Sequence, residues 1–481
     1  MGCISEKLFH ASMKVLLSNY TIFADMKATN ILLIIVAVCL LPLYLTSCGE
    51  DRWAAYAEQT ATTRWIDDTM RVWYYWKDEL PESNQLNYFQ APAQFFASLL
   101  SRSDKYSYID SLTTAAATRS IPDTDYSYGF QFAVGQIDGQ VCAHVLYVAA
   151  SSPADEAGLK RGDWILAMDG EAVTMNNYSR LFGGPSMQLT LGYYQATENA
   201  IVTDPQPHTL SAARAIDDCP VHYSCMLDIN GTRTGYLVYN HFSAGATDNG
   251  TEYDNKLRSV FSTFASNEVE EFVLDLRYNN GGLVSCAQLL CTLLAPASAL
   301  GSEMGYLEFN DRITPQIQAF TFNPDLIGHG ANLNLKRLFV LTSSNTASAS
   351  EMVINCLRPV MDVVLVGGTT VGKNVGSRAF VNTERLITMS PIICRLYNAA
   401  GESDYESGFV PDAAYTVDEN SDMSRFLPFG DPDEALLHVA LNAIAGGSPS
   451  DSEPEASPER LSMDVRSQSI ERRASGAVRI R

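Results

Sequence analysis

Metal-binding and nucleotide-binding patterns are missing from this sequence. It contains ten cysteines and seven histidines, but no Cys-x-x-Cys pair and no histidine–glutamate cluster with the spacing of metal ligands. The run from Gly367 to Lys373 has the spacing of a phosphate-binding loop, yet Asn374 follows it where such a loop needs serine or threonine for magnesium. We therefore predict no metal, no nucleotide and no other cofactor.

Positive charge is also scarce. The chain has 33 lysines and arginines against 55 aspartates and glutamates, which gives a formal net charge of −22. Phosphates would repel such a chain, so nucleic acid is not an expected partner. Hydrophobic residues make up 46% of the sequence and charged residues 18%, a balance that predicts a large core rather than global disorder. The length of 481 residues allows two or three domains.

The apolar run Ile31–Leu45 is too short for a comfortable membrane span. A basic start and small residues after the run make a secretory signal, with a plain membrane anchor as the alternative. Because the small residues end at Cys48, the segment 26–48 resembles a bacterial lipoprotein signal peptide. The acidic residues that follow resemble surface-export tags of Bacteroidetes lipoproteins. We expect translation to begin at Met26, residues 1–25 to be an upstream extension, and lipid at Cys48 to anchor the protein in the bacterial cell envelope, on the outer membrane, facing the periplasm or the cell surface.

Three of the ten cysteines lie in or before this segment. The remaining seven are odd in number and most lie in apolar runs, so buried free thiols are expected at Cys142, Cys219, Cys225, Cys286, Cys291, Cys356 and Cys394. Cys219 and Cys225 could instead close a small loop in an oxidising compartment, and the sequence leaves this open.

Four segments that differ in composition and periodicity follow the signal segment. Residues 49–125 show aromatic residues at helical spacing, which predicts a helical subdomain with an aromatic core. Residues 126–200 contain short strands. Residues 201–446 alternate strands and helices, as an α/β domain does, with one strand expected at Ile387–Arg395 and the last helix at Asp431–Ala445. Residues 447–481 are rich in serine, proline, glutamate and arginine with few apolar residues, and we predict a disordered tail.

One strand–turn–helix carries the clearest chemistry. The strand Arg337–Leu341 leads through a polar turn into a helix that starts near Ser348, where free backbone N–H groups favour negative charge. The next strand, Val363–Val366, delivers Lys373. A serine beside a lysine held out of water can make an acyl-transfer site, because a neutral amine can take the hydroxyl proton. None of the histidines has serine and aspartate partners that can be read from the sequence.

The block Thr346–Glu351 reads Thr-Ala-Ser-Ala-Ser-Glu and resembles the nucleophile motif of the carboxyl-terminal processing (tail-specific) serine peptidases, in which the first serine attacks. Their lysine follows in a Thr-x-Gly-Lys turn, and Lys373 ends such a turn at the family's distance from Ser348. The resemblance implies a Ser348–Lys373 catalytic dyad. It leaves Ser350 and Glu351 as structural residues that cap and orient the helix start.

A second block, Asp275–Gly282, resembles the family's loop whose glycine N–H completes an oxyanion hole. The resemblance implies donors at Ala349 and at Gly281 or Gly282, and the choice between the glycines stays open. A late turn, Gly408–Asp412, resembles a structural turn of the family. The expected fold is multidomain: an α/β peptidase core (a crotonase/ClpP-like ββα sheet with helices), a mainly β PDZ domain and an N-terminal helical subdomain.

The stretch Ala157–Gly170 (AGLKRGDWILAMDG) resembles a PDZ domain. PDZ domains capture a peptide carboxy-terminus by adding it as a strand and hold its carboxylate with backbone N–H groups. The resemblance implies that Tyr128, Gly129, Phe130 and Phe132 form the peptide-binding loop and strand. A PDZ domain that only packs against the core is the alternative.

One departure from the family stands near the lysine. Many relatives carry a glutamine four residues after it, thought to orient it, whereas the run Lys373–Ser377 has none and holds Gly376 near that place. Asn374, Ser377 or backbone carbonyls would then orient Lys373, or activity is impaired. The sequence thus predicts a serine endopeptidase that cleaves polypeptides near their accessible carboxy-termini, with a catalytically inactive peptide-binding PDZ scaffold lipoprotein as the alternative.

Overall fold

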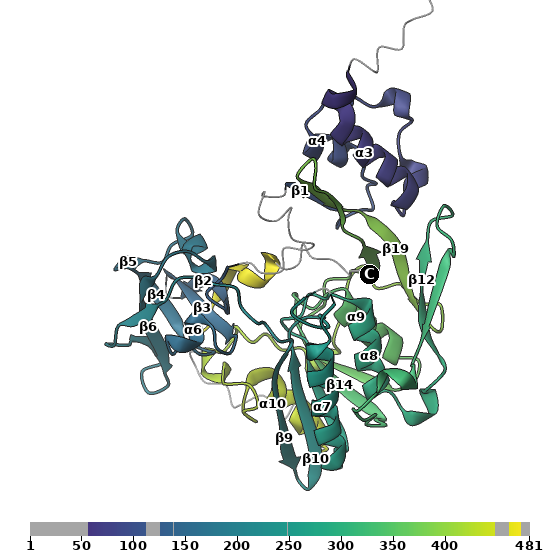
Figure 1. Cartoon of the computed structure of the whole chain (residues 1–481). Coiled ribbons are helices and arrows are strands. Elements are labelled where there is room, and N and C mark those ends of the chain that lie inside the picture. The colour runs from purple at the N-terminus through teal and green to yellow at the C-terminus, as the bar shows by residue number, and fades with distance from the viewer. Residues whose placement is uncertain (1–55, 112–125, 138, 248, 448–460, 473–481) are drawn as a thin grey trace, which may run out of the picture. The chain divides into compact units, whose positions relative to one another are not determined.

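The computed structural model describes residues 56–111, 126–137, 139–247, 249–447 and 461–472 (Figure 1). The backbone contacts divide the chain into two units, Met1–Ala61 and Thr62–Arg481, and only residues 56–61 of the first are described. The predicted upstream extension, the signal segment and the lipid site at Cys48 lie outside the described residues. Where residues are described, no helix is both long and apolar enough to cross a bilayer.

The predicted N-terminal helical segment is present. It contains α3 (Ala57–Trp73), α4 (Pro92–Leu99) and two short 3₁₀ turns. Its core is apolar and partly aromatic, as the spacing predicted, and consists of Ile66, Met70, Tyr74, Phe95, Phe96 and Leu99. The strand β1 (Tyr108–Ser111) then pairs with β18 (Ile387–Ser390). This pairing joins the helical segment to a three-stranded sheet in the order β1-β18-β17, where β17 is Phe380–Asn382.

The PDZ part is a mainly antiparallel sheet in the order β20-β2-β3-β4-β6-β7. The strands are β2 (Phe130–Ile137), β3 (Gln140–Val148), β4 (Trp164–Met168), β6 (Met187–Gln195) and β7 (Ala200–Thr203), with α6 (Pro153–Glu156) after β3. Alternate residues of β2 point into one apolar core with β4 and β6. The predicted mainly β PDZ domain is therefore confirmed.

The prediction of a disordered tail is wrong for residues 461–472. β20 (Asp464–Gln468) adds to the edge of β2 as an antiparallel strand, and a short 3₁₀ turn follows it. The tail has few apolar residues, but Leu461, Met463 and Ile470 are all buried. An existing strand edge supplies the backbone hydrogen bonds, so a polar segment needs only a few such anchors to dock.

The peptidase core is a five-stranded sheet in the order β15-β14-β11-β10-β9. Four strands are parallel: β10 (Thr232–Tyr239), β11 (Glu271–Asp275), β14 (Arg337–Thr342) and β15 (Asp362–Gly367). The edge strand β9 (Val221–Ile229) is antiparallel to β10. Parallel strands need crossovers, which contain α7 (Glu252–Ser266), α8 (Val284–Leu294) and α9 (Ala349–Leu357). The predicted α/β core is confirmed.

Two apolar cores cover the two faces of this sheet. Leu274 and Val340 point to the face covered by α7, α8 and α9. Val273 and Phe339, their neighbours in the chain, point to the face covered by α10 (Ala435–Ile444). Strand side chains alternate between faces, so continuous apolar strands such as β11 fit a sheet buried on both sides.

Two element boundaries differ from the sequence prediction. The expected strand Ile387–Arg395 is divided at Pro391 into β18 and β19 (Ile392–Asn398), because proline has no N–H to donate to a ladder. The last helix was expected from Asp431 but begins after Glu434, whose carboxylate accepts the N–H groups of Leu436 and Leu437 as an N-cap. A further sheet has the order β13-β12-β19-β16 and includes β12 (Glu303–Phe309), β13 (Ile317–Thr321) and β16 (Val375–Ser377).

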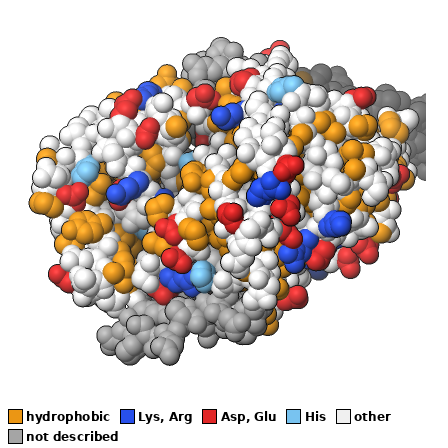
Figure 2. All heavy atoms as spheres, turned by 90° about the horizontal axis from the view of Figure 1, so that it is seen from below, with side chains coloured by type: hydrophobic (Ala, Val, Ile, Leu, Met, Phe, Trp, Pro, Cys, Tyr) orange, Lys and Arg blue, Asp and Glu red, His pale blue; other side chains and the backbone are white. Residues whose placement is uncertain are grey.

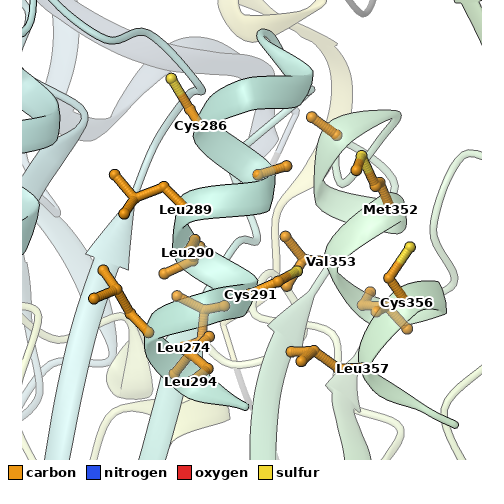
Figure 3. Close-up of a cluster of buried hydrophobic side chains, with 14 of the residues drawn as sticks. Leu274, Cys286, Leu289, Leu290, Cys291, Leu294, Met352, Val353, Cys356 and Leu357 are labelled. Carbon is orange, nitrogen blue, oxygen red and sulfur yellow. The ribbon is translucent and has the colours of Figure 1, made fainter. Parts of the chain in front are cut away.

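The cysteines are mostly packing residues. All seven described cysteines are free, five of them buried and Cys219 and Cys225 half-buried. Figure 3 shows Cys286 and Cys291 on α8 and Cys356 on α9 among leucine side chains. Burial raises the pKa of the Cys142 and Cys394 thiols to about 12, so these thiols stay protonated and unreactive at neutral pH.

The molecular face in Figure 2 carries acidic and basic side chains scattered among apolar ones. No broad basic patch is visible on that face. This distribution agrees with the net charge of −22 and with an acidic, well-solvated surface.

Candidate active site

Ser348 lies at the turn between β14 and α9, as the N-cap residue of the helix. Its backbone has φ = +63°, a conformation that costs free energy for a residue with a side chain and persists only where the surroundings impose it. Ser348 is 2% exposed, and its Oγ has no hydrogen-bond partner among the described residues. A buried hydroxyl without a partner, on a strained turn, is the arrangement of a nucleophile held for a substrate.

The loop after β11 holds this turn in place. The backbone carbonyl of Asn279 accepts the N–H of Ala347 at 3.1 Å and the Oγ–H of Ser350 at 2.9 Å. The Thr346 hydroxyl donates to the carbonyl of Leu276 at 2.9 Å. Ser350 is therefore a structural residue, as predicted, but it fixes the neighbouring loop rather than capping the helix.

Gly281, rather than Gly282, faces Ser348. Its φ is +107°, and a Cβ there would lie 2.8 Å from Ser348 Cβ and 3.1 Å from the nitrogen of Ala349. A Cβ on Gly282 would instead clash with the backbone of Phe242. The Gly281 N–H donates to Asn279 Oδ1 at 2.9 Å, so it must leave that partner before it can bind an oxyanion.

Glu351 joins the two predicted dyad residues. Its buried carboxylate accepts the backbone N–H of Ser348 at 2.7 Å, of Gly372 at 2.6 Å and of Lys373 at 2.8 Å. The Thr370 hydroxyl donates to it at 2.6 Å. The role predicted for Glu351 at the helix start is confirmed, and its hold on the lysine turn is an addition that the sequence did not reveal.

Lys373 is 5% exposed and lies in a protein environment that disfavours its charge. Burial lowers the pKa of the Lys373 ammonium to about 8, although the Glu351 and Asp104 carboxylates act to raise it. A substantial neutral fraction near pH 8 is what a general base requires. Burial also raises the pKa of Glu351 above its usual value, while its four hydrogen bonds oppose this shift.

Tyr106 is a site residue that the sequence analysis missed. Lys373 Nζ lies 5.0 Å from the centroid of its ring, and the Tyr106 hydroxyl donates weakly to the carbonyl of Gly372 at 3.4 Å. A pocket of about 120 Å³ is lined by both of them and by Asn280, Ser344, Asn345, Ala347 and Val371. Only the fold brings Tyr106 here, because it is distant in sequence from every motif.

The candidates for orienting Lys373 are only partly supported. The Asn374 amide nitrogen donates to Ser403, so this nitrogen is engaged away from the lysine amine. The fourth residue after Lys373 is Ser377 rather than Gly376, and it is buried in β16 (Val375–Ser377). Within the described part of the chain, no hydrogen bond joins either of them to the lysine amine. The aromatic ring of Tyr106 lies over the amine, and the Glu351 and Asp104 carboxylates act on it through their charge.

Comparison with known proteins bears on this arrangement. A family model described as peptidase family S41 matches residues 233–415, one for the S41 N-terminal domain matches residues 61–108, and a PDZ model matches residues 144–190. The crystal structure of a protein assigned to the S41 proteases, from Bacteroides fragilis, is 40% identical to the chain. That similarity covers 79% of this chain and 97% of the other, with a TM-score of 0.73. The chain belongs to peptidase family S41.

Curated relatives of this S41 protein are named as carboxyl-terminal-processing enzymes. The protease of Synechocystis sp. is 25% identical, over 62% of this chain and 64% of that relative. The chloroplastic peptidase 1 of Arabidopsis thaliana is 29% identical, over 49% of this chain and 45% of that relative. The chain thus spans between 45% and 64% of the length of these two relatives. The predicted family resemblance is confirmed.

The predicted peptide-binding residues of this S41 protein lie in and beside β2. The side chains of Tyr128, Phe130 and Phe132 are buried in the PDZ core. The Tyr128 hydroxyl donates to the carbonyl of Pro185 at 2.6 Å. Any peptide would therefore meet backbone groups of this segment rather than its aromatic rings. Where residues are described, no cluster of three or more potential metal ligands is found.

A buried ionic network connects the PDZ part of the S41 protein with its peptidase core. Arg277, in the loop after β11, pairs with Asp275 and with Glu434 at 2.6 Å, and both carboxylates are fully buried. Arg161, from the PDZ loop before β4, reaches the same Glu434 at 3.3 Å and the hydroxyl of Tyr278 at 2.8 Å. The sequence motifs contain Arg161 and Arg277, but nothing in them indicates that the two side chains share a carboxylate.

Proposed function

We propose that this S41 protein is a serine endopeptidase that cleaves polypeptides near their carboxy-terminal end. One observation carries the proposal: the Glu351 carboxylate holds the backbone of Ser348, whose buried hydroxyl has no partner, and of Lys373, whose amine is buried. An acyl-transfer site needs a hydroxyl that is free to attack and a lysine with a lowered pKa. Glu351 holds the backbones of the two residues that carry these groups.

The chemistry begins with proton transfer to Lys373. In the neutral state its amine accepts the proton of Ser348 Oγ once substrate brings the two together, and Oγ attacks the scissile carbonyl. The N–H groups of Ala349 and Gly281 bind the oxyanion, after Gly281 releases Asn279 Oδ1. The Lys373 ammonium then protonates the leaving amine and becomes neutral again. The neutral amine takes a proton from the water molecule that attacks the acyl-enzyme, and this proton passes to Ser348 Oγ when the ester bond breaks.

Substrate capture and location complete the proposal. A polypeptide with an accessible carboxy-terminus adds as a strand to β2, with backbone groups of Tyr128–Phe132 receiving its end. Lipid at Cys48 holds the enzyme on the membrane of the bacterial cell envelope.

Cleavage of an unstructured protein with an apolar carboxy-terminus tests the catalytic proposal. We expect Ser348→Ala and Lys373→Ala to lose activity by up to about a millionfold, the size seen when a serine protease loses its nucleophile. Ser259→Ala and Lys336→Ala, at exposed positions, are matched controls that should cleave normally. Equal cleavage by the parent and Ser348→Ala would reject the proposal.

A second candidate, a peptide-binding scaffold without activity, draws on the bond from Gly281 N–H to Asn279, which leaves the oxyanion hole unassembled. Binding of the polypeptide tail by a parent protein that neither cleaves it nor labels at Ser348 with a serine-directed probe would establish the scaffold instead.

A further inference from the structure

The outer edge of β2 is already occupied. In the sheet order β20-β2-β3, one side of β2 pairs with β3 and the other side with β20, from the C-terminal part of the same chain. The register joins Ala133 to Gln468 and Gln136 to Asp464. Figure 1 shows this yellow segment beside β2. The strand edge to which a peptide would be added is therefore covered by an internal segment.

The covering segment runs in the direction of a captured tail. Because β20 is antiparallel to β2, its carboxyl end at Gln468 lies toward the start of β2, opposite Ala133. A PDZ ligand has this direction, with its carboxy-terminus at the loop that precedes the strand. Ser469 also bonds to β2 as a bound peptide would, since its Oγ accepts the N–H of Phe132 at 2.8 Å and donates to Gln131 Oε1 at 2.6 Å.

The last residues of the segment, Gln468–Ile470, reach toward the candidate active site. The carbonyl of Ile470 accepts Asn280 Nδ2–H at 2.9 Å. The side-chain oxygen of Gln468 accepts Asn345 Nδ2–H at 2.7 Å. Asn280 and Asn345 both line the pocket that contains Lys373, so the segment connects the β2 edge with the rim of that pocket.

The buried side chains of the segment lie at its two ends, and between them β20 is held by its backbone pairing with β2. Leu461 and Met463 are buried on one side and Ser469 and Ile470 on the other. Asp464 and Arg466 between these ends are exposed and form an ion pair with each other rather than with the PDZ strands. Such a strand can be detached from the edge without breaking a charge pair with the rest of the protein.

We propose that residues 461–470 are a built-in ligand of the β2 edge, and that a polypeptide tail must displace them before it reaches the pocket. This inference rests on the proposed capture of substrate at β2. A tethered ligand acts at a high effective concentration, so it lowers the apparent affinity for any competitor. If it occupies the edge in about nine molecules of ten, a competing peptide binds about tenfold more weakly.

Peptide binding to the full chain tests the proposal without catalysis. In a Ser348→Ala background, Ile470→Asp should release the segment, because a charge replaces a fully buried side chain. We expect a fluorescent peptide with a free apolar carboxy-terminus to bind about tenfold more tightly to the Ile470→Asp protein, because the segment no longer occupies the β2 edge in about nine molecules of ten. Arg466→Ala, which removes an exposed side chain of the same segment, is the matched control and should bind like the parent.

A chain ending at Gly447 gives a second measurement. It should bind the same fluorescent peptide as tightly as the Ile470→Asp protein does, and a synthetic peptide of residues 461–472 should compete, whereas a scrambled peptide of the same composition should not. Unchanged affinity in both Ile470→Asp and the shortened chain, or failure of the synthetic peptide to compete, overturns the proposal. If the shortened chain does not fold, the Ile470→Asp result alone decides.

These outcomes separate this inference from the proposed function. Tighter peptide binding without the segment, together with a protein that never cleaves, would keep the built-in ligand and reject the peptidase. Cleavage with unchanged peptide affinity would keep the peptidase and reject the built-in ligand.

Discussion

Glu351 is the residue on which the candidate site depends. A single buried carboxylate accepts the backbone N–H groups of Ser348, Gly372 and Lys373, so the backbones of the two proposed dyad residues are held to one group. The negative charge also acts on the lysine amine, where it opposes the effect of burial on the pKa. Glu351 therefore affects both the positions of Ser348 and Lys373 and the protonation of the Lys373 amine.

The first prediction concerns pH. Activity should rise with pH through about 8, because only the neutral form of Lys373 accepts the serine proton. In Glu351→Gln the carboxylate that raises the pKa of Lys373 is gone, so the rise should move to lower pH. The maximal rate should also fall, because the amide keeps one acceptor oxygen and puts an NH2 donor where the other oxygen accepted two hydrogen bonds. A pH–rate profile measures both effects, with exposed Glu303→Gln as control. An unshifted profile in Glu351→Gln would contradict this reading.

The second prediction concerns Tyr106. Its ring covers the Lys373 amine, so Tyr106→Ala should admit water, raise the pKa of the lysine and move the rise in activity to higher pH. Tyr106→Phe keeps the ring and loses only a long hydrogen bond, and should behave like the parent. The comparison of the two profiles is the measurement, and identical profiles for Tyr106→Ala and Tyr106→Phe would rule out this role.

At the scale of elements, the site forms where the ends of two neighbouring parallel strands meet. The loop after β11 and the turn after β14 are joined through the carbonyl of Asn279, and β11 pairs directly with β14. The carboxyl ends of adjacent parallel strands lie at one edge of the sheet, so residues far apart in sequence come together there. Gly281 faces Ser348 because the loop after β11 and the turn after β14 lie side by side.

The third prediction concerns that glycine. In Gly281→Ala the new methyl group would press against Ser348 and the nitrogen of Ala349, so we expect activity to fall at least about a hundredfold, the cost of disturbing an oxyanion hole. Gly301→Ala is the matched control, since Gly301 also has positive φ but open space around it. Thermal unfolding measures the stability that each variant loses, and similar loss of activity in both would show that backbone strain alone is responsible.

At the scale of the whole molecule, the PDZ part and the peptidase core share buried charges. Glu434, the N-cap of α10, receives both Arg277 from the core and Arg161 from the PDZ loop. Such a network is costly to break from one side, because the remaining charges stay buried without a partner. The network ties the loop after β11, which contains Arg277 and the two glycines, and the PDZ loop with Arg161 to the same carboxylate, Glu434.

The fourth prediction follows from this network. Arg277→Met should destabilise the protein by about 3–5 kcal/mol, because Asp275 and Glu434 would lose their shared counter-ion. Arg233→Ala, which breaks a pair with exposed Glu268, should cost at most about 1 kcal/mol. Urea unfolding measures the difference. A cost for Arg277→Met no larger than that of Arg233→Ala would show that the buried pairs add nothing.

The sequence determined a large share of this protein by itself. Apolar strands alternating with amphipathic helices predicted the α/β core, because local periodicity reports directly which faces are buried. The spacing between Ser348 and Lys373 predicted the catalytic pair, since both motifs are short and local. The structure changed the boundaries most where a proline or a cap intervened, as at Pro391 and Glu434.

Only the tertiary structure decided the contacts between distant segments. It placed Tyr106 at Lys373, chose Gly281 over Gly282 to face Ser348, and docked residues 461–468 on β2. A polar tail and an isolated tyrosine have no periodicity or motif of their own. Their positions follow from the free strand edges and surfaces that exist once the rest of the chain has folded, which is information that no local stretch of sequence contains.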